Sequence, residues 1–232
     1  MAGYTPQIVF EDNHLLIISK AAGDLVQGDK TGDTSLIDHL KAYIKQRDHK
    51  PGNVFLGLTH RLDRPTTGLV IFAKTSKALS RMNEKFKKRQ IHKIYWAIVP
   101  KLPPGTPTEA TLRHYLLKNP KTNRVTVYQH PGNKAQEAIL HYNLLTQLDN
   151  YAALEIELET GRSHQIRAQL SKIGLPIKGD LKYGSPRSNT DGSIHLHARL
   201  VQFTHPVTKE QITVTAPAPI HYAIWQAVEQ KV

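Results

Sequence analysis

The sequence contains no cysteine among its 232 residues. The chain therefore cannot form a disulfide framework, a thiolate metal site, an iron–sulfur cluster or a cysteine nucleophile. Long apolar runs are also missing, because the longest purely aliphatic run, Leu15 to Ile18, is far shorter than the roughly 20 residues of a membrane span. The first residues, Met1 to Gln7, have no apolar core and do not resemble a secretory signal. We therefore expect a cytoplasmic protein that does not enter membranes.

Acidic residues are scarce as well. The 31 Lys and Arg residues oppose 19 Asp and Glu residues, which gives a formal net charge of +12 with histidines neutral. This surplus favours a polyanionic partner. Hydrophobic residues make up 39% of the chain, which is enough to build a core and too much for a disordered protein. The sequence has neither a P-loop nor a dinucleotide-binding fingerprint, so we expect no nucleotide cofactor.

Strand patterns outnumber helix patterns along the chain. Short apolar or alternating segments predict strands at residues 8–10, 15–18, 54–58, 69–72, 91–99, 138–148, 153–159, 194–203 and 211–215. Helical spacing predicts one helix capped by Thr34 or Ser35 and others over Ser76–Gln90, Ser163–Ile173 and His221–Gln230. Because short turns join many of the strands, we expect an α+β fold: a single domain over residues 1–232, with a largely antiparallel mixed sheet and flanking helices.

Two segments concentrate positive charge. Residues 74–93 hold eight Lys or Arg and one acid, Glu84, on a predicted helix and the strand that follows. Residues 113–134 are also polar and basic, and no strand is predicted there. Each segment has two interpretations: a solvated helix face or a loose surface loop, or a surface or arm that follows phosphates. The candidate phosphate contacts are Lys87, Lys88 and Arg89 in the first segment and Arg113, Lys121 and Arg124 in the second.

The segment His60–Gly68 is the strongest candidate for chemistry. Its Asp63 is the only carboxylate between His49 and Asn83, and it lies between Arg61 and Arg64. Nearby positive charge favours the ionised form of a carboxyl group, so we expect Asp63 to be charged and held by these arginines. Taken alone, the segment is more typical of a surface loop whose aspartate forms ion pairs.

Two further segments carry polar groups at element boundaries. Thr160–Arg167 lies at a strand-to-helix junction, where Arg162 and the helix N-terminus favour an anion. Arg167 is turned by roughly 100° from the apolar stripe of that helix and can face a neighbouring carboxylate. Tyr95 lies on the polar face of a strand, beside Lys93. In isolation these patterns are also typical of solvated arginines and a packing tyrosine.

Together these segments resemble one family. The run HRLDRPTTGLVIFAK at residues 60–74 is similar to the signature of the RluA-type pseudouridine synthases. Further matches follow in the family's order at residues 11–23, 93–97, 161–167, 174–184 and 197–206, so that the resemblance covers roughly Ile8 to Pro217. Ala21 replaces the usual proline and Thr67 the usual serine. The resemblance implies a pseudouridine synthase fold with a central catalytic cleft, and an RNA isomerase without metal or cofactor. We expect no separate N-terminal RNA-binding domain.

The resemblance also implies roles for particular residues. Asp63 is the catalytic carboxylate, which could attack the ribose, attack the uracil ring or abstract a ribose proton. Arg167 is its partner, Tyr95 packs against the target base, and Arg61 fills the space that the flipped-out base leaves. The RNA-binding residues are expected to be His60, Arg61, Arg64, Lys93, Arg162 and His164, with Lys87, Lys88, Arg89, Arg113, Lys121 and Arg124. The expected substrate is a stem-loop of ribosomal or transfer RNA, bound by a monomer.

Two alternatives were weighed against this function. A non-catalytic RNA-binding protein that retains the fold would explain the charge equally well, but it gains nothing from a carboxylate such as Asp63 facing phosphates. A metal-dependent hydrolase is suggested only by the 13 histidines. His195 and His197 share one strand face, but no third ligand is spaced to complete a site, so we expect no metal.

Overall fold

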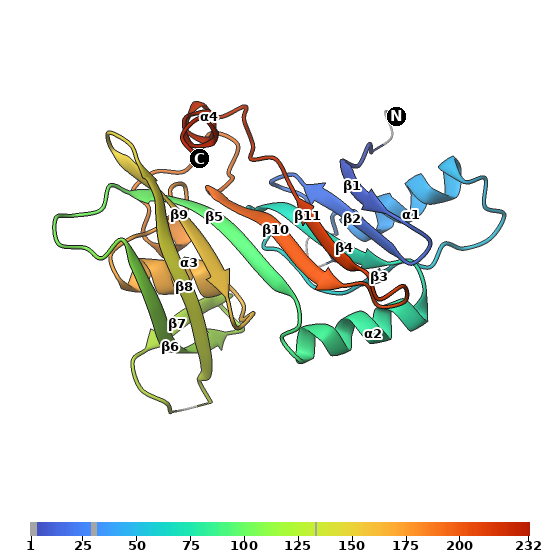
Figure 1. Cartoon of the computed structure of the whole chain (residues 1–232), viewed down its shortest axis with the longest axis horizontal. Helices are drawn as coiled ribbons and strands as arrows, with labels where there is room; N and C mark the ends of the chain where they lie inside the picture. Colours follow the sequence, from blue (N-terminus) through green and yellow to red (C-terminus); the bar gives the residue numbers. More distant parts are fainter. Residues whose placement is uncertain (1–3, 29–31, 133) are drawn as a thin grey trace. The chain divides into compact units, whose positions relative to one another are not determined.

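The computed structural model describes residues 4–28, 32–132 and 134–232. The chain divides into two units, and each is built from two separate stretches of sequence (Figure 1). Unit 1 contains the described residues up to His92 together with Leu200–Pro217, and unit 2 contains Lys93–Arg199 and Ala218–Val232. The chain therefore passes from one unit to the other after residues 92, 199 and 217.

Unit 1 is built on antiparallel strands. Strands β1 (Ile8–Glu11) and β2 (Leu15–Lys20) form the predicted hairpin, and β2 pairs with β4 (Thr67–Ala73). The short strand β3 (Gly57–Leu58) also pairs with β4. Strand β10 (Leu196–Thr204) pairs with β11 (Gln211–Thr215) over its last five residues, which belong to this unit. The apolar residues of β2 and β4 are buried on both faces, which explains their continuous aliphatic runs.

Two helices complete unit 1, and each begins at a side-chain cap. Helix α1 (Leu36–Arg47) begins after Ser35, whose hydroxyl accepts a hydrogen bond from the backbone N–H of Asp38. Helix α2 (Ser76–Lys87) begins after Thr75, which accepts from the N–H of Ala78. Both helices bury an apolar stripe, and Met82 of α2 packs into the main core cluster of the unit. The exposed face of α2 carries the predicted basic residues.

Unit 2 contains an antiparallel sheet in the order β5 (His92–Pro100), β9 (Tyr151–Leu158), β8 (Gln136–Gln147), β6 (Glu109–Asn119) and β7 (Arg124–Tyr128). Its helices are α3 (Gln165–Lys172), the 3-10 turn η1 (Leu181–Tyr183) and α4 (Ala223–Glu229). Trp225 and Val228 of α4 pack against Trp96 and Ile98 of β5. The α+β class and the antiparallel pairing are thus confirmed, whereas a single domain over the whole chain stays a prediction.

Several predicted boundaries were wrong. Residues 113–134 contain strand residues, because β6 and β7 form a hairpin that buries Leu116 and Val125, while Arg113, Lys118 and Arg124 of the same strands are exposed. The predicted strand at residues 54–58 is reduced to Gly57–Leu58. Helix α3 begins at Gln165 rather than Ser163, because His164 adopts a left-handed backbone conformation with φ of 51°. None of the helices in the described part of the chain has the length and apolar character needed to cross a bilayer.

Candidate active site

Asp63 lies in a tight turn that leads into β4. The backbone N–H of Thr66 donates to the carbonyl oxygen of Asp63 over 3.0 Å, which closes the turn. Leu62 is buried and anchors the turn to unit 1, whereas the side chain of Asp63 is half-buried. Contacts within unit 1 therefore hold the backbone on both sides of Asp63.

A buried lysine fixes the path of this turn. Lys20, the last residue of β2, is only 1% exposed. Its ammonium donates to the carbonyl oxygens of Ala21 (2.7 Å), Asp24 (3.0 Å) and Arg64 (3.0 Å). Burial lowers the pKa of Lys20 to about 8, although the charges of Asp24 and Asp63 oppose this decrease. Lys20 has no role predicted from the sequence. Its only signal there is that a charged residue ends an otherwise apolar strand.

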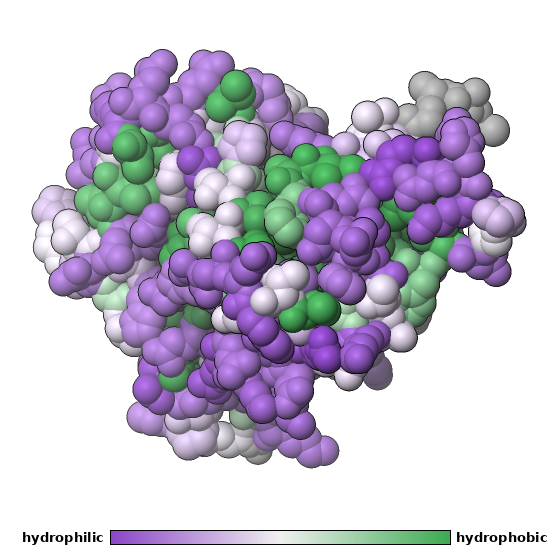
Figure 2. Space-filling model, turned by 45° about the vertical axis from the view of Figure 1, so that its right-hand side comes forward, coloured by the Kyte–Doolittle hydropathy of each residue, from purple (hydrophilic) through white to green (hydrophobic). Residues whose placement is uncertain are grey.

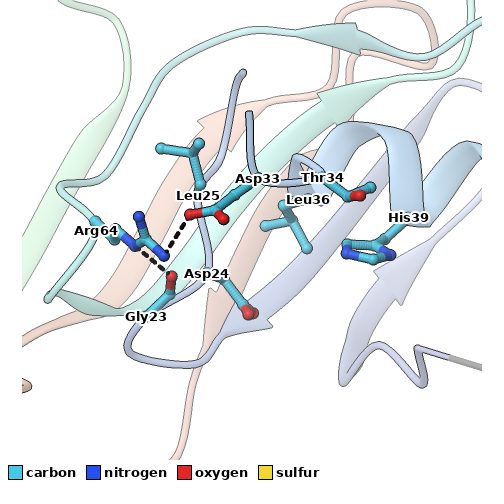
Figure 3. Close-up of a pocket in the computed structure, with 8 residues that line it drawn as sticks. All are labelled: Gly23, Asp24, Leu25, Asp33, Thr34, Leu36, His39 and Arg64. Carbon is cyan, nitrogen blue, oxygen red and sulfur yellow. Dashed lines mark hydrogen bonds and ion pairs between the residues drawn. The ribbon is translucent and has the colours of Figure 1, made fainter. Parts of the chain in front are cut away.

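Arg64 connects the turn that carries Asp63 to another segment of unit 1. Figure 3 shows its side chain at a small pocket that is also lined by Gly23 and Asp33. The guanidinium donates through Nε to the carbonyl oxygen of Gly23 over 2.9 Å, and a terminal nitrogen pairs with a carboxylate oxygen of Asp33 at 2.9 Å. Arg64 therefore ties this turn to the loop before α1, while its expected role as a counter-charge to Asp63 stays a prediction. Arg61 is exposed.

The other predicted RNA-binding residues of unit 1 fall into two groups. The imidazole Nε2 of His60 accepts a hydrogen bond from the N–H of Ile71 over 3.1 Å, and its ring packs on Phe86. His60 therefore supports β4 as well as leading into the turn that carries Asp63. The residues Lys87, Lys88 and Arg89 are exposed at the end of α2, where Lys88 pairs with Glu84 at 2.7 Å.

In unit 2, Tyr95 and Lys93 lie on the same side of β5. Tyr95 is buried and pairs with Ile156 of β9 in the sheet register. The ammonium of Lys93 lies close to the turn before α3, since a methyl group placed on Gly161 would be 3.6 Å from its nitrogen. Burial lowers the pKa of Lys93. This strand and the turn at residues 160–164 thus bring together two segments that the sequence singled out separately.

Gln165 shapes the turn before α3. Its side-chain oxygen accepts from the hydroxyl of Thr160 (2.8 Å) and from the N–H of Arg162 (2.9 Å), and its nitrogen donates to the carbonyl of Ile139 (3.0 Å). His164, the residue before Gln165, has a left-handed backbone conformation that is uncommon for a residue with a Cβ atom. Such a conformation persists only where surrounding contacts hold it, and it is often found at functional sites.

Arg167 forms a bidentate ion pair with a buried carboxylate. Its Nε and one terminal nitrogen donate to the two oxygens of Asp180 at 2.6 and 2.9 Å. Arg167 is 5% exposed and Asp180 is 1% exposed. Two parallel hydrogen bonds fix the plane of the guanidinium as well as its position. The prediction that Arg167 faces a carboxylate is confirmed for Asp180, a residue given no role from sequence, while its pairing with Asp63 stays a prediction.

The remaining predicted RNA-binding residues of unit 2 surround the β6–β7 hairpin, which we call the arm (residues 109–128). Arg113 pairs with Glu137, and Nε of Arg162 donates to the carbonyl oxygen of Glu137 over 3.0 Å. Lys121 is exposed at the tip of the arm, and Arg124 is exposed near it. Hydrophilic side chains cover most of the face shown in Figure 2. In the described part of the chain, no group of three or more His, Asp or Glu residues is arranged to hold a metal ion.

One family model, described as RNA pseudouridylate synthase, matches residues 14–172 of this chain. The chain belongs to this family. The matched residues include Asp63, Tyr95 and Arg167, and the resemblance to RluA-type pseudouridine synthases is confirmed. Asp180 lies beyond the matched segment.

Individual members of the pseudouridine synthase family match most of this chain. It is 35% identical over 230 residues to an uncharacterized RNA pseudouridine synthase of Synechocystis, covering 93% of this chain and 66% of that protein. It is 32% identical over 229 residues to the ribosomal large subunit pseudouridine synthase D of Xylella fastidiosa, covering 91% and 66%. The chain thus spans about two thirds of these curated relatives. The structure of human RNA pseudouridylate synthase domain containing 4 matches with a TM-score of 0.78 and 25% identity, covering 96% of this chain and 92% of that one.

Proposed function

We propose that this chain isomerises uridine to pseudouridine in RNA, with Asp63 as the catalytic carboxylate. The observation that carries the proposal is the position of Asp63 in the HRLD segment, on a turn held by Lys20 and within the residues that match the family. A glycoside hydrolase generally needs two carboxylates that flank the scissile bond. One carboxylate among several cations suits an isomerase, which keeps its leaving base, better than a hydrolase.

The proposed reaction breaks the glycosidic N–C bond, turns the uracil and joins a ring carbon to the ribose. It involves no redox change and needs no cofactor. Asp63 acts in its ionised form, either as a nucleophile toward the ribose or the ring or as the base that removes a ribose proton. Tyr95 packs against the target base, and Arg167 stabilises the charge of Asp63 while Asp180 fixes the orientation of its guanidinium.

The proposed substrate is a stem-loop of RNA, whose target base must leave its stack before Asp63 can reach it. Extrusion costs a few kcal/mol, and less in a loop than in a duplex. Arg61 fills the vacated space, and the cations of α2 and of the arm bind phosphates. Ribosomal RNA is the first candidate, because the relative from Xylella fastidiosa is named for the large ribosomal subunit. Transfer RNA is the second candidate, and we place the enzyme in the cytoplasm as a monomer.

The test uses transcripts of large-subunit ribosomal RNA and of transfer RNAs that carry tritium on carbon 5 of uracil, since isomerisation releases this hydrogen. We expect Asp63→Asn to release tritium about a thousandfold more slowly than the unmodified chain, or slower still, with comparable RNA affinity. Asp149→Asn is the matched control, because Asp149 is exposed in the turn between β8 and β9.

Two results would contradict the proposal. Normal turnover by the Asp63→Asn variant would show that this carboxylate is not catalytic. Binding without tritium release by the unmodified chain, on every transcript, would favour a non-catalytic RNA-binding protein. Mapping pseudouridine in cells that lack the gene would then identify the uridine that the active enzyme modifies.

A further inference from the structure

Tyr183 connects the arm to the helix that carries Arg167. It ends the turn η1 and is 3% exposed. Its hydroxyl accepts a hydrogen bond from the backbone N–H of Val125 in β7 over 2.8 Å, and the same oxygen lies 2.8 Å from Nδ1 of His164. The guanidinium carbons of Arg167 and Arg124 lie 5.1 and 5.7 Å from the centre of its ring. One side chain therefore contacts the arm, the turn before α3 and Arg167.

The hydroxyl of Tyr183 forms a directional chain of hydrogen bonds. Strand β7 ends the strand order of unit 2, so the N–H of Val125 that faces away from β6 needs a partner outside the sheet. The hydroxyl accepts this bond, and its own proton is then available for Nδ1 of His164. A buried phenol that both accepts and donates fixes the separation of the two groups that it joins.

At one end, this chain of hydrogen bonds reaches helix α3, which carries Arg167 of the proposed active site. The bond to Tyr183 holds His164 in its left-handed conformation, and Arg167 follows three residues later on α3. The guanidinium of Arg167 lies between the ring of Tyr183 and the carboxylate of Asp180. A shift of Tyr183 would therefore move the backbone at the start of α3 and the packing surface of the arginine together.

At its other end, the chain of hydrogen bonds reaches the arm, which carries the exposed cations. Val125 and Leu116 of the arm pack with Ala168 of α3 and with Tyr183 in one buried cluster. Near the tip, the ammonium of Lys182 donates to the carbonyl oxygen of Asn123 over 3.2 Å. Lys182 and Tyr183, two of the three residues of η1, thus hold the arm at neighbouring positions. Arg124, between those positions, is exposed to solvent and can bind a phosphate.

We propose that Tyr183 is a positioning residue that couples RNA binding by the arm to the placement of Arg167. The proposal rests on the proposed function, because it takes the arm as an RNA contact. RNA phosphates that bind Arg124 favour the docked arm, the docked arm keeps the hydroxyl of Tyr183 on Val125 and His164, and this arrangement favours the reactive position of Arg167. Substrate binding and the rate of the chemical step are therefore linked through one tyrosine.

The test compares Tyr183→Phe with Tyr43→Phe. The first variant keeps the ring and removes the hydroxyl, whereas Tyr43 is a half-buried tyrosine of α1 in unit 1, outside the arm and the proposed site. With the tritiated transcripts described above, we expect kcat to fall about threefold to tenfold in Tyr183→Phe, as for the loss of one or two buried hydrogen bonds, and to stay unchanged in Tyr43→Phe.

A double-mutant cycle separates coupling from a merely structural role. Arg124→Gln is expected to raise KM and also to lower kcat in the unmodified chain. In the Tyr183→Phe background it should raise KM only, because the connection to Arg167 is already broken. If both substitutions lower kcat additively, or if Tyr183→Phe leaves kcat unchanged, the coupling is wrong. Because Arg124 is exposed, Arg124→Gln by itself also tests the coupling. An effect of this substitution confined to KM would overturn the proposal.

Failure of the proposed function would look different. The unmodified chain would then release no tritium, and the coupling would be decided by amide hydrogen exchange with the same transcripts bound. RNA binding that slows exchange in α3 of the unmodified chain, but not of Tyr183→Phe, would support the coupling. Equal protection of α3 in both chains would overturn it.

Discussion

The two units hold their charged residues by different means. In unit 1, the turn that carries Asp63 is fixed through its main chain, because the buried ammonium of Lys20 binds three carbonyl oxygens. In unit 2, Arg167 is fixed through its side chain, because both oxygens of Asp180 bind its guanidinium. The first arrangement determines the path of a loop. The second determines the orientation of a functional group.

This difference follows from the chemistry of the two partners. An ammonium is a point charge with three rotatable donors, which suits carbonyl groups that arrive from several directions. A guanidinium is planar, and a carboxylate matches it in one plane with two parallel hydrogen bonds. Substitution of Lys20 should therefore disturb a backbone conformation, whereas substitution of Asp180 should disturb a single side chain and leave a buried charge without its partner.

The largest effect is expected for Asp180→Ala. Loss of the carboxylate removes the counter-charge that Asp180 provides to the buried guanidinium of Arg167, and breaking a buried ion pair in this way costs about 3–5 kcal/mol. We expect a decrease of this size in the free energy of unfolding, measured by urea denaturation. Asp149→Ala should leave stability nearly unchanged, since Asp149 is exposed. Equal stability of the two variants would show that Asp180 does not stabilise unit 2.

Lys20→Met should have the next largest effect. The substitution preserves most of the buried volume and removes the donors to the carbonyl groups of Ala21, Asp24 and Arg64. Unsatisfied buried polar groups cost about 1–3 kcal/mol each, and relaxation of the loop recovers part of this loss, so we expect destabilisation by about 2–4 kcal/mol. Urea denaturation gives this value, and Lys45→Met, on the exposed face of α1, is the control. An unaffected variant would show that the ammonium does not hold the turn.

The comparison also predicts a pH dependence that arises from Lys20 in unit 1. The pKa of Lys20 is about 8 in the folded protein and near its ordinary value of 10.5 in the unfolded chain. Between these values the unfolded chain binds more protons, so this group makes stability rise as pH increases from 8 to 10.5. The difference in unfolding free energy between the unmodified chain and Lys20→Met should increase over this range. A difference that is constant with pH would contradict the burial of a charged ammonium.

The smallest expected effects concern the exposed cations of the two units. Three variants are compared, and in each of them three cations are replaced by glutamine. The first changes Lys87, Lys88 and Arg89, and the second changes Arg113, Lys121 and Arg124. The third, which is the control, changes Lys41, Lys45 and Lys50. Each cation that contacts a phosphate contributes about 0.7 to the slope of log affinity against log salt for single strands. We expect each of the first two triple variants to lower the slope by about 1–2, and the control, with substitutions in and just after α1, to leave it unchanged. Equal slopes in all three variants would assign these cations to solvent.

The sequence predicts the elements better than the contacts between them. The hairpin of β1 and β2 and the capped helix α1 follow from local apolar spacing and from Ser35, and both are confirmed. The arm was missed as a hairpin because charged residues obscure the alternation around Leu116 and Val125. The start of α3 was misplaced because His164 adopts a left-handed backbone conformation, and its side chain contacts Tyr183, which lies 19 residues later.

The catalytic candidates were found from motifs, whereas the residues that hold them were not. Lys20 lies 44 residues before the carbonyl of Arg64 that it binds, and Asp180 lies 13 residues after Arg167. Arg64 pairs with Asp33, a partner 31 residues earlier that no local pattern indicates, while its expected pairing with Asp63 stays a prediction. Adjacency in sequence does not reveal such a partner, because tertiary packing selects among distant groups.

The interleaving of the two units has a consequence for synthesis on the ribosome. Unit 1 needs Leu200–Pro217, and unit 2 needs Ala218–Val232, so unit 1 lacks some of its residues until Pro217 has left the exit tunnel and unit 2 until Val232 has left it. A nascent chain of 92 residues would expose the edge of β4 and the apolar cluster that Val201, Phe203 and Val214 later cover. Slow translation in this interval would therefore prolong the time during which the polypeptide needs a chaperone.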